Sequence, residues 1–258
     1  MVAPALLRVV ERQVVVWARL WRGAVFSSFV TPLLFLGAMG IGLGDLIDER
    51  TGEVGGVPYL VFVAPGLLAA SAMQAAAGES LWPVMAGTKW LRFFHAMVAT
   101  PLRPADVFGG YILWVAFRIA LSATAFLAVA SLLGAVRSPW AVAAVPAAML
   151  SGAAFAAPLT AYSGAQDTDF RFPLIMRLGV LPLFLFSGTF FPIDQLPGAL
   201  QPLAVASPLY HGVELCRAAT TGVVPSAAVL AGHVAVLAAF VAAGWLWGTR
   251  TFSRKLAA

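Results

Sequence analysis

The chain is poor in charged residues and in cysteine. Asp, Glu, Lys and Arg make up 10% of its 258 residues, whereas soluble domains carry roughly 25%. Apolar residues make up 61%, and the mean hydropathy is +0.90. A water-soluble core of this size would leave a large apolar surface facing solvent. The composition therefore excludes an ordinary soluble domain and predicts an all-α, polytopic integral membrane protein, with about six transmembrane helices of roughly 20 residues each.

The lone cysteine, Cys216, excludes an intramolecular disulfide and a cysteine-rich metal site. The three histidines, His95, His211 and His233, lack the HExxH spacing and fall in different predicted segments. We therefore predict no catalytic residue and no metal ligand. His211 and Glu214 are three residues apart, and we expect them to form a local polar pair.

The sequence also lacks a phosphate-binding loop of the form GxxxxGK[ST]. Gly87-Thr88-Lys89 has no glycine-rich run before it, and such a loop needs a soluble strand–turn–helix unit. If the chain takes part in ATP-driven work, the nucleotide must therefore bind to a separate polypeptide.

Six apolar stretches are predicted to cross the membrane, at about residues 23–44, 58–81, 107–132, 140–162, 173–191 and 226–248. No internal repeat or linker divides the chain, so residues 1–258 are predicted to form one domain. Residues 1–22 precede the first span, and their charged and apolar side chains separate onto opposite helical faces. The charged face holds Arg8, Glu11, Arg12, Arg19 and Arg22, and the apolar face holds Leu6, Val10, Val14, Trp17 and Trp21. This pattern predicts an amphipathic helix in the membrane interface rather than a cleavable signal peptide.

Lysine and arginine are distributed unevenly between the predicted loops. Twelve fall in segments assigned to the inside: Arg8, Arg12, Arg19, Arg22, Lys89, Arg92, Arg103, Arg171, Arg177, Arg250, Arg254 and Lys255. Three fall outside: Arg50, Arg137 and Arg217. This bias predicts that both termini are cytoplasmic. We interpret the net charge of +5 as loop cations beside anionic membrane lipid, not as a nucleic-acid-binding surface.

Residues 83–106 form the main predicted cytoplasmic loop. Lys89, Arg92 and His95 recur at helical spacing and are expected to share one face of a short amphipathic helix. Thr100-Pro101 stops this helix, and Arg103 follows. From the residues alone, the helix is either a docking element for a partner or a plain interfacial loop.

Glu79 and Arg118 are the charged residues at the greatest predicted membrane depth. Such groups are costly in lipid and usually face a partner or a wet cavity. Arg118 is expected to face the protein interior, paired with Glu79, a backbone carbonyl or an anionic substrate group. For Glu79, which lies near the end of its span, snorkelling to the interface is the alternative.

Residues 192–222 carry closely spaced prolines that no straight spanning helix could contain. The segment is nevertheless too apolar for a solvated loop. It therefore predicts short helices that re-enter the outer leaflet, with Asp194, His211 and Glu214 near headgroup level. Before this segment, Phe184, Phe186, Phe190 and Phe191 either contact lipid and neighbouring helices or line a hydrophobic path.

Three segments resemble the type-2 ABC exporter permeases. SGTFFPIDQLP (residues 187–197) and SPLYHGVELCR (residues 207–217) resemble the family signature, and TPLRPADVFGGYILW (residues 100–114) resembles its cytoplasmic loop. The similarity is closest to the subgroup that exports nodulation factors, which are lipo-oligosaccharides, and to its drug-resistance relatives.

The resemblance implies the permease subunit of an ATP-driven exporter in a bacterial inner membrane. It implies two copies of a separate ATPase subunit that binds ATP and Mg, a second permease copy forming a homo- or heterodimer, and no cofactor on this chain. The cargo is expected to be an amphipathic glycolipid or lipo-oligosaccharide, or a hydrophobic drug. The expected ATPase-coupling residues are Lys89, Arg92, His95, Thr100, Pro101 and Arg103. The expected substrate-pathway residues are Gln74, Glu79, Arg118, Phe184, Phe186 and Phe190.

Two other functional classes remain as alternatives, an ion-coupled secondary carrier and an intramembrane enzyme. A carrier is expected to place several acidic residues within its spans, and only Glu79 approaches that position. An enzyme is expected to show a convergent nucleophile or metal set, and the sequence shows no such pattern.

Overall fold

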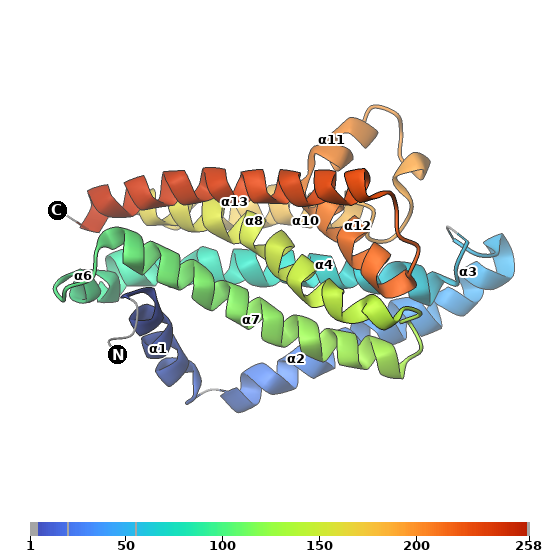
Figure 1. Ribbon diagram of the computed structural model, residues 1–258, viewed down its shortest axis with the longest axis horizontal. Helices are drawn as coiled ribbons and strands as arrows, with labels where there is room; N and C mark the ends of the chain where they lie inside the picture. Colours follow the sequence, from blue (N-terminus) through green and yellow to red (C-terminus); the bar gives the residue numbers. More distant parts are fainter. Residues whose placement is uncertain (1–4, 20, 55, 257–258) are drawn as a thin grey trace.

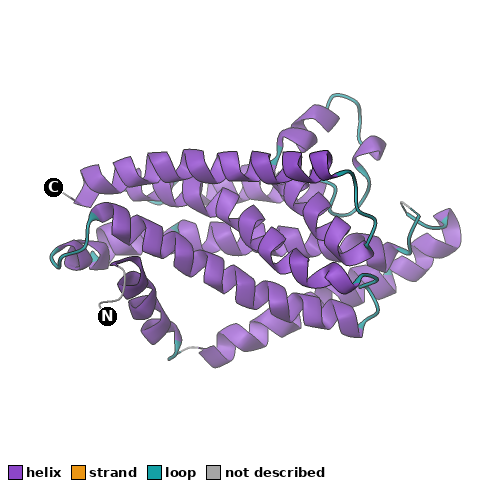
Figure 2. Cartoon of the chain, in the orientation of Figure 1, coloured by secondary structure: helices purple, strands orange, loops and turns teal. Residues whose placement is uncertain are grey.

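The computed structural model describes residues 5–19, 21–54 and 56–256. Within these ranges the chain consists of helices and loops, and β pairing is limited to an isolated bridge between Val54 and Val57 (Figure 2). The protein is therefore all-helical, as the composition predicts.

Within the described ranges, four helical stretches are long and apolar enough to cross a membrane. They are Tyr59–Trp90, comprising α4 (Tyr59–Ser80), α5 (Trp82–Met85) and η2 (Ala86–Trp90); α7 (Pro104–Leu132); Pro139–Ala165, comprising η3 (Pro139–Ala143) and α8 (Ala144–Ala165); and α13 (Ala227–Leu256). The first and fifth predicted spans correspond to less regular helices. They are α2 (Trp21–Phe35) continuing as η1 (Leu36–Gly42), and a shorter apolar helix built from α9 (Phe172–Ile175), η4 (Met176–Val180) and α10 (Leu181–Phe186).

The long helices run roughly along one axis, and the short elements cluster at its two ends (Figure 1). One end carries α1 (Ala5–Trp17), α6 (Phe93–Val98) and the last turns of α13, and we call it the α6 end. The opposite end carries α3 (Gly44–Thr51), and we call it the α3 end. The described parts of both terminal helices therefore lie at the same end.

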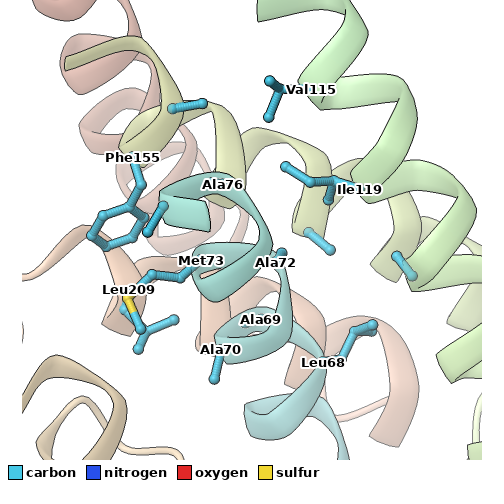
Figure 3. Packing of buried hydrophobic residues seen from close by; sticks show 14 of the residues in the cluster. Leu68, Ala69, Ala70, Ala72, Met73, Ala76, Val115, Ile119, Phe155 and Leu209 are labelled. Atoms are coloured by element: carbon cyan, nitrogen blue, oxygen red, sulfur yellow. The ribbon is translucent and has the colours of Figure 1, made fainter. Parts of the chain in front are cut away.

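Helix α4 occupies the centre of the bundle, where most of its side chains are buried. It packs against α8, α12 (Pro208–Thr221) and α7. Small and flexible side chains form much of this core, and Figure 3 shows several of them: Leu68, Ala69, Ala70, Ala72, Met73 and Ala76 of α4, with Val115 and Ile119 of α7, Phe155 of α8 and Leu209 of α12. Because water does not drive helices together inside a membrane, close backbone approach between small residues supplies much of the attraction.

Gly66 shows how tight this packing is on the α3 side of α4. A Cβ atom at this position would lie 2.6 Å from the carbonyl oxygen of Thr189. Only glycine therefore admits the backbone of the segment that follows α10. Through this contact, the segment around Thr189 packs directly against the central helix α4.

Helix α1 packs against the bundle through two residues that the sequence pattern does not single out. Val9 and Gln13 are buried, whereas Val14, assigned to the apolar face, is exposed. The reason lies in α7, where a Cβ at Gly110 would approach Val9 Cβ to 2.6 Å. The absence of a side chain at Gly110 therefore leaves room for Val9. The predicted helix over residues 1–22 also ends earlier, since α1 stops at Trp17 and α2 begins at Trp21; residues 1–4 and 20 lie outside the described ranges.

The loop over residues 83–106 does not form the single amphipathic helix that its spacing predicts. Residues up to Trp90 continue the long helix that begins at Tyr59, and only the six residues of α6 form a separate helix. Between them Arg92 adopts a left-handed conformation, with φ 52° and ψ 27°. Lys89, Arg92 and His95 therefore do not share one helical face, because the chain reverses at Arg92.

The proline-rich segment is broken into short helices, as predicted. After α10 come η5 (Ile193–Gln195), α11 (Gln201–Ala206) and α12. The Gln201 side-chain amide donates to the carbonyl oxygen of Leu196 at 2.9 Å, and Ser207 Oγ accepts from the backbone N–H of Leu209 at 3.1 Å. These bonds satisfy backbone groups that the interrupted helices leave open.

The close approach at Gly66 generates a stability prediction. Gly66→Ala should lower the unfolding free energy by about 1–3 kcal/mol, because the new methyl group overlaps the Thr189 backbone. Gly78→Ala in the same helix is the matched control, since a Cβ there meets no atom within 4 Å. Thermal unfolding of both purified variants in detergent measures the difference. Equal midpoints for the two variants would contradict the packing described here.

Candidate functional site: an ion pair between two cavities

The helix over Tyr59–Trp90 is interrupted at Leu81, close to the α6 end. Pro83 has no backbone N–H, so it cannot donate to the carbonyl oxygen of Glu79, four residues earlier. The Tyr111 hydroxyl of α7 donates to this oxygen instead, at 2.7 Å. Ser163 Oγ of α8 donates to the carbonyl oxygen of Leu81, also at 2.7 Å. Side chains of two neighbouring helices thus satisfy the backbone at the break, as a membrane interior requires.

The carboxylate of Glu79 forms an ion pair with α7. Glu79 Oε1 lies 3.3 Å from Arg118 Nη2, and the two side chains are 24% and 29% exposed. The Arg118 guanidinium also lies 5.8 Å from the centroid of the Trp114 ring, at the limit of a cation–π contact. Of the partners expected for Arg118, the structure therefore contains Glu79. Each charge is neutralised by the other, which lowers the cost of placing both inside the bundle.

A cavity of about 350 Å³ lies between α2, α4, α7 and α10, and we call it the mid-depth cavity. Its apolar lining includes Pro32, Phe35, Leu67, Ile119, Phe126 and Phe184. Ser71, Gln74 and Ser122 add uncharged polar groups, and Glu79 and Arg118 contribute the ion pair. The cavity is therefore amphipathic, with its charges gathered toward the α6 end.

A second cavity, of about 480 Å³, lies under α1 at the α6 end, and we call it the interfacial cavity. Helix α1 contributes Arg12, Gln13 and Trp17, and α7 contributes Tyr111 and Trp114. Three residues line both cavities: Trp17, Glu79 and Arg118. The ion pair therefore lies at the junction between the two cavities.

A third cavity, of about 390 Å³, lies at the α3 end beside a second ion pair. Arg217 pairs with Glu214 in α12 and donates from Nη2 to the carbonyl oxygen of Gly188 at 2.8 Å. Its guanidinium carbon lies 4.2 Å from the centroid of the Phe62 ring of α4. Arg217 therefore joins α12, α4 and the turn after α10.

The predicted polar pair between His211 and Glu214 is wrong. Glu214 turns to Arg217, whose charge is permanent, and His211 turns to His233 of α13. The two Nδ1 atoms lie 2.8 Å apart, and both rings are buried. At this distance one Nδ1 atom carries a proton and donates, and the other accepts. The pair ties α12 to α13, although the sequence places its members 22 residues apart. Asp194 stays exposed on η5, away from this pair.

The segment that reverses at Arg92, residues 89–103, lies at the α6 end, and we call it the tip. Lys89 Nζ lies 3.3 Å from Asp167 Oδ1, and Lys255 Nζ lies 2.8 Å from the same oxygen. Hydrogen bonds from Lys255 and Lys89 hold the pKa of the Asp167 carboxyl below its ordinary value. Burial, with the nearby Arg92 charge, lowers the pKa of His95. His95 is therefore neutral near pH 7.

Other members of the tip face solvent. Arg92, Thr100, Pro101 and Arg103 are exposed, as are the apolar side chains of Trp90 and Leu91. Thr100 Oγ1 donates to the carbonyl oxygen of Met97 at 2.6 Å and ends α6. The tip therefore presents basic and apolar groups together on a surface fixed by the turn at Arg92.

Comparison with known proteins places this architecture in a family. The profile of the ABC-2 type transporter family matches residues 4–220. The chain belongs to the ABC-2 type transporter family. It is 31% identical to Nodulation protein J of Rhizobium leguminosarum bv. viciae over 253 residues, covering 97% of this chain and 94% of that protein. It is 28% identical to Nodulation protein J of Rhizobium meliloti (strain 1021) over 247 residues, covering 95% and 92%. The resemblance of the three sequence segments to this family is therefore confirmed.

In this ABC-2 chain, four of the six predicted pathway residues line the mid-depth cavity: Gln74, Glu79, Arg118 and Phe184. Phe190 lies behind them, with its ring centroid 5.0 Å from that of Phe184. Phe186 is 42% exposed and does not line the cavity, because it falls on the opposite side of the short helix α10 from Phe184. A transport role for these residues stays a prediction.

The sequence analysis missed the contribution of α1 to the ABC-2 site. Arg12 and Trp17 line cavities, whereas their helical positions suggested only a solvated face and a membrane anchor. No local sequence signal distinguishes Arg12 from the other arginines of this helix, because the burial of the neighbouring Gln13 appears only in the structure. Ser71, Ser122 and Phe126 were missed because apolar spans contain many such residues without function.

The hydroxyl of Tyr111 gives a prediction for this ABC-2 chain. Tyr111→Phe removes the donor to the Glu79 carbonyl and leaves a buried backbone acceptor unpaired. The unfolding free energy should fall by about 1–3 kcal/mol. Thermal unfolding in detergent measures the loss, and Tyr162→Phe is the control, since its ring packs beside Phe172 and its hydroxyl forms no hydrogen bond among the described residues. Unchanged stability of Tyr111→Phe would mean that water replaces the hydroxyl.

The Glu79–Arg118 pair gives a second prediction. Glu79→Gln leaves the guanidinium without its counter-charge, so it should destabilise the protein by about 1–3 kcal/mol, less than a fully buried pair because of the partial exposure. The double variant Glu79→Gln/Arg118→Gln removes both charges and should recover part of the loss. A double-mutant cycle on unfolding midpoints measures the coupling. Additive effects of the two single changes would show that the pair is not coupled.

Proposed function

We propose that this chain is the membrane-spanning permease subunit of an ATP-driven exporter. Its cargo would be an amphipathic glycolipid or lipo-oligosaccharide that leaves the cytoplasm or the inner leaflet of a bacterial inner membrane. The observation that carries the proposal is the family match over most of the chain, with relatives at about 30% identity that are named Nodulation protein J. The amphipathic mid-depth cavity supports it, because such a cargo has both polar and apolar parts.

The proposed orientation places the α6 end in the cytoplasm, with both termini on that side. The argument is electrostatic. The α6 end holds the basic residues of α1, the tip and the end of α13, while Arg50, Arg137 and Arg217 lie on segments toward the α3 end. Cytoplasmic loops of membrane proteins carry such an excess of lysine and arginine.

The power source in this proposal is a separate ATPase subunit, present in two copies, with ATP and Mg bound on that subunit. A second permease copy, identical or homologous, would complete the path for the cargo. The tip is the proposed docking element. Its exposed Trp90 and Leu91 offer apolar contact, and Arg92 and Arg103 offer charge. The tip continues from the helical stretch over Tyr59–Trp90, so a displacement of the tip would reach Glu79 through the break at Leu81.

A hydrophobic drug is the second candidate cargo, favoured by the aromatic part of the mid-depth cavity, where the Phe184 ring contacts those of Phe35 and Phe190. An ion-coupled carrier without an ATPase is the alternative mechanism. Its coupling group would have to be Glu79, which is already paired with Arg118.

The test is transport in inverted membrane vesicles that contain the chain and the ATPase that copurifies with it. A fluorescently labelled lipo-oligosaccharide should accumulate only with ATP, and accumulation should survive a proton ionophore. Arg92→Glu in the tip should reduce both copurification of the ATPase and transport by about tenfold, as expected for loss of one docking charge. Arg50→Glu on α3, exposed at the other end, is the matched control and should leave both unchanged.

Two outcomes would contradict the proposal. Accumulation without ATP that collapses with the proton gradient would establish a carrier. Equal loss in the Arg92 and Arg50 variants would remove the tip as the docking element.

A further inference from the structure

The interfacial cavity has an unbalanced set of hydrogen-bonding groups. Its donors include the guanidinium groups of Arg12 and Arg118 and the indole N–H of Trp17. Its one carboxylate, Glu79, is already paired with Arg118. The lining therefore carries one positive charge in excess.

Arg12 provides that excess charge. Its Nη1 donates to the neighbouring Gln13 Oε1 at 3.2 Å, and its guanidinium carbon lies 4.1 Å from the centroid of the Phe93 ring. Within the described residues it forms no ion pair. A guanidinium held against an aromatic ring beside a cavity is well placed for bidentate binding of an oxyanion.

Trp17 supplies a second unmet group. Its Nε1 atom is buried and has no hydrogen-bond acceptor among the described residues. Buried donors without partners are rare, and an unfilled ligand site is one physical reason for them. Because Trp17 lines both cavities, an acceptor that satisfies it would sit at their junction.

The mid-depth cavity continues from this junction into apolar surroundings. Leu67, Ile119, Phe126 and Phe184 line it. A ligand that fills both cavities must therefore be polar and anionic at the α6 end and apolar toward the middle of the bundle. An inner-leaflet amphiphile has this orientation if the α6 end is cytoplasmic.

We propose that the two cavities together bind one amphiphile whose anionic head group, a phosphate, sulfate or carboxylate, lies between Arg12, Arg118 and the Trp17 indole, and whose tail occupies the mid-depth cavity. The site belongs to a single copy of the chain. The inference rests on the proposed export role only where it treats the ligand as cargo, because binding itself needs neither the ATPase nor a second copy.

The test measures binding of dodecyl phosphate to the purified full chain in dodecyl maltoside. Dodecyl phosphate should raise the thermal unfolding midpoint in a saturable manner. Inorganic phosphate, which lacks the tail, and additional dodecyl maltoside, which lacks the charge, should leave the midpoint unchanged. A neutral amphiphile that stabilises equally well would overturn the assignment of an anionic head group.

Variants locate the site. Arg12→Gln should weaken dodecyl phosphate binding by about tenfold, the loss expected for one charge-assisted contact. Arg12→Lys keeps the charge but loses the bidentate geometry, so its affinity should lie between those of the wild type and Arg12→Gln, which separates loss of charge from loss of folding. Arg8→Gln, exposed on the same helix, is the matched control and should bind as the wild type does. Unchanged affinity in Arg12→Gln would overturn the proposal.

Native mass spectrometry of the freshly extracted protein distinguishes two sources of the ligand. A retained phospholipid that dodecyl phosphate displaces would identify a membrane lipid as the occupant. If the protein carries no bound lipid and still binds dodecyl phosphate, the occupant is an anionic cargo. If dodecyl phosphate does not bind while ATP-dependent transport is intact, the site is wrong and the export role stands. If dodecyl phosphate binds while ATP-dependent transport is absent, the site stands and the export role is wrong.

Discussion

The backbone at Glu79 is the constraint on which the site depends. A membrane interior offers no water to an unpaired carbonyl, so the proline that breaks the long helix requires a donor from elsewhere. The Tyr111 hydroxyl supplies it and thereby sets how α7 lies against α4. Arg118 lies seven residues further along α7, two turns away on the same face, and this places it opposite the Glu79 carboxylate. One backbone group thus aligns both halves of the ion pair.

The bundle is tight on one side of α4 and open on the other. Toward α8 and α12, alanine and glycine bring the backbones close together. Toward α1, α2 and α10 the partners are bulkier, and the mid-depth and interfacial cavities lie between them. The Glu79–Arg118 pair lies where the packing is loose, because a guanidinium and a carboxylate need room and polar neighbours. The same asymmetry separates a rigid scaffold from the elements that line the cavities.

Much of the architecture follows from the sequence, because membrane spans depend on length and hydropathy. The spans at Pro104–Leu132 and Pro139–Ala165 lie within a few residues of their predicted ranges. The Glu79–Arg118 pair was also predictable from the sequence, since isolated charges in neighbouring spans have few other partners. The left-handed turn at Arg92 was not predictable from the sequence, because residues other than glycine rarely adopt this conformation and the packing of α6 determines it. The contact between His211 and His233 likewise depends on how α12 meets α13, which no local pattern encodes.

The α6 end is stabilised by different interactions from those in the rest of the bundle. There Asp167 holds Lys89 and Lys255 in an exposed cluster, while the middle is held by the shape of small side chains. Mobile ions screen exposed charges over about 8 Å at physiological ionic strength, and they do not act on buried packing. A rise in salt concentration therefore weakens the ion pairs of Asp167 with Lys89 and Lys255, which join the tip to α13, and leaves the core intact. The ionic strength of the surrounding solution would then set how stiffly the tip is joined to the last turns of α13.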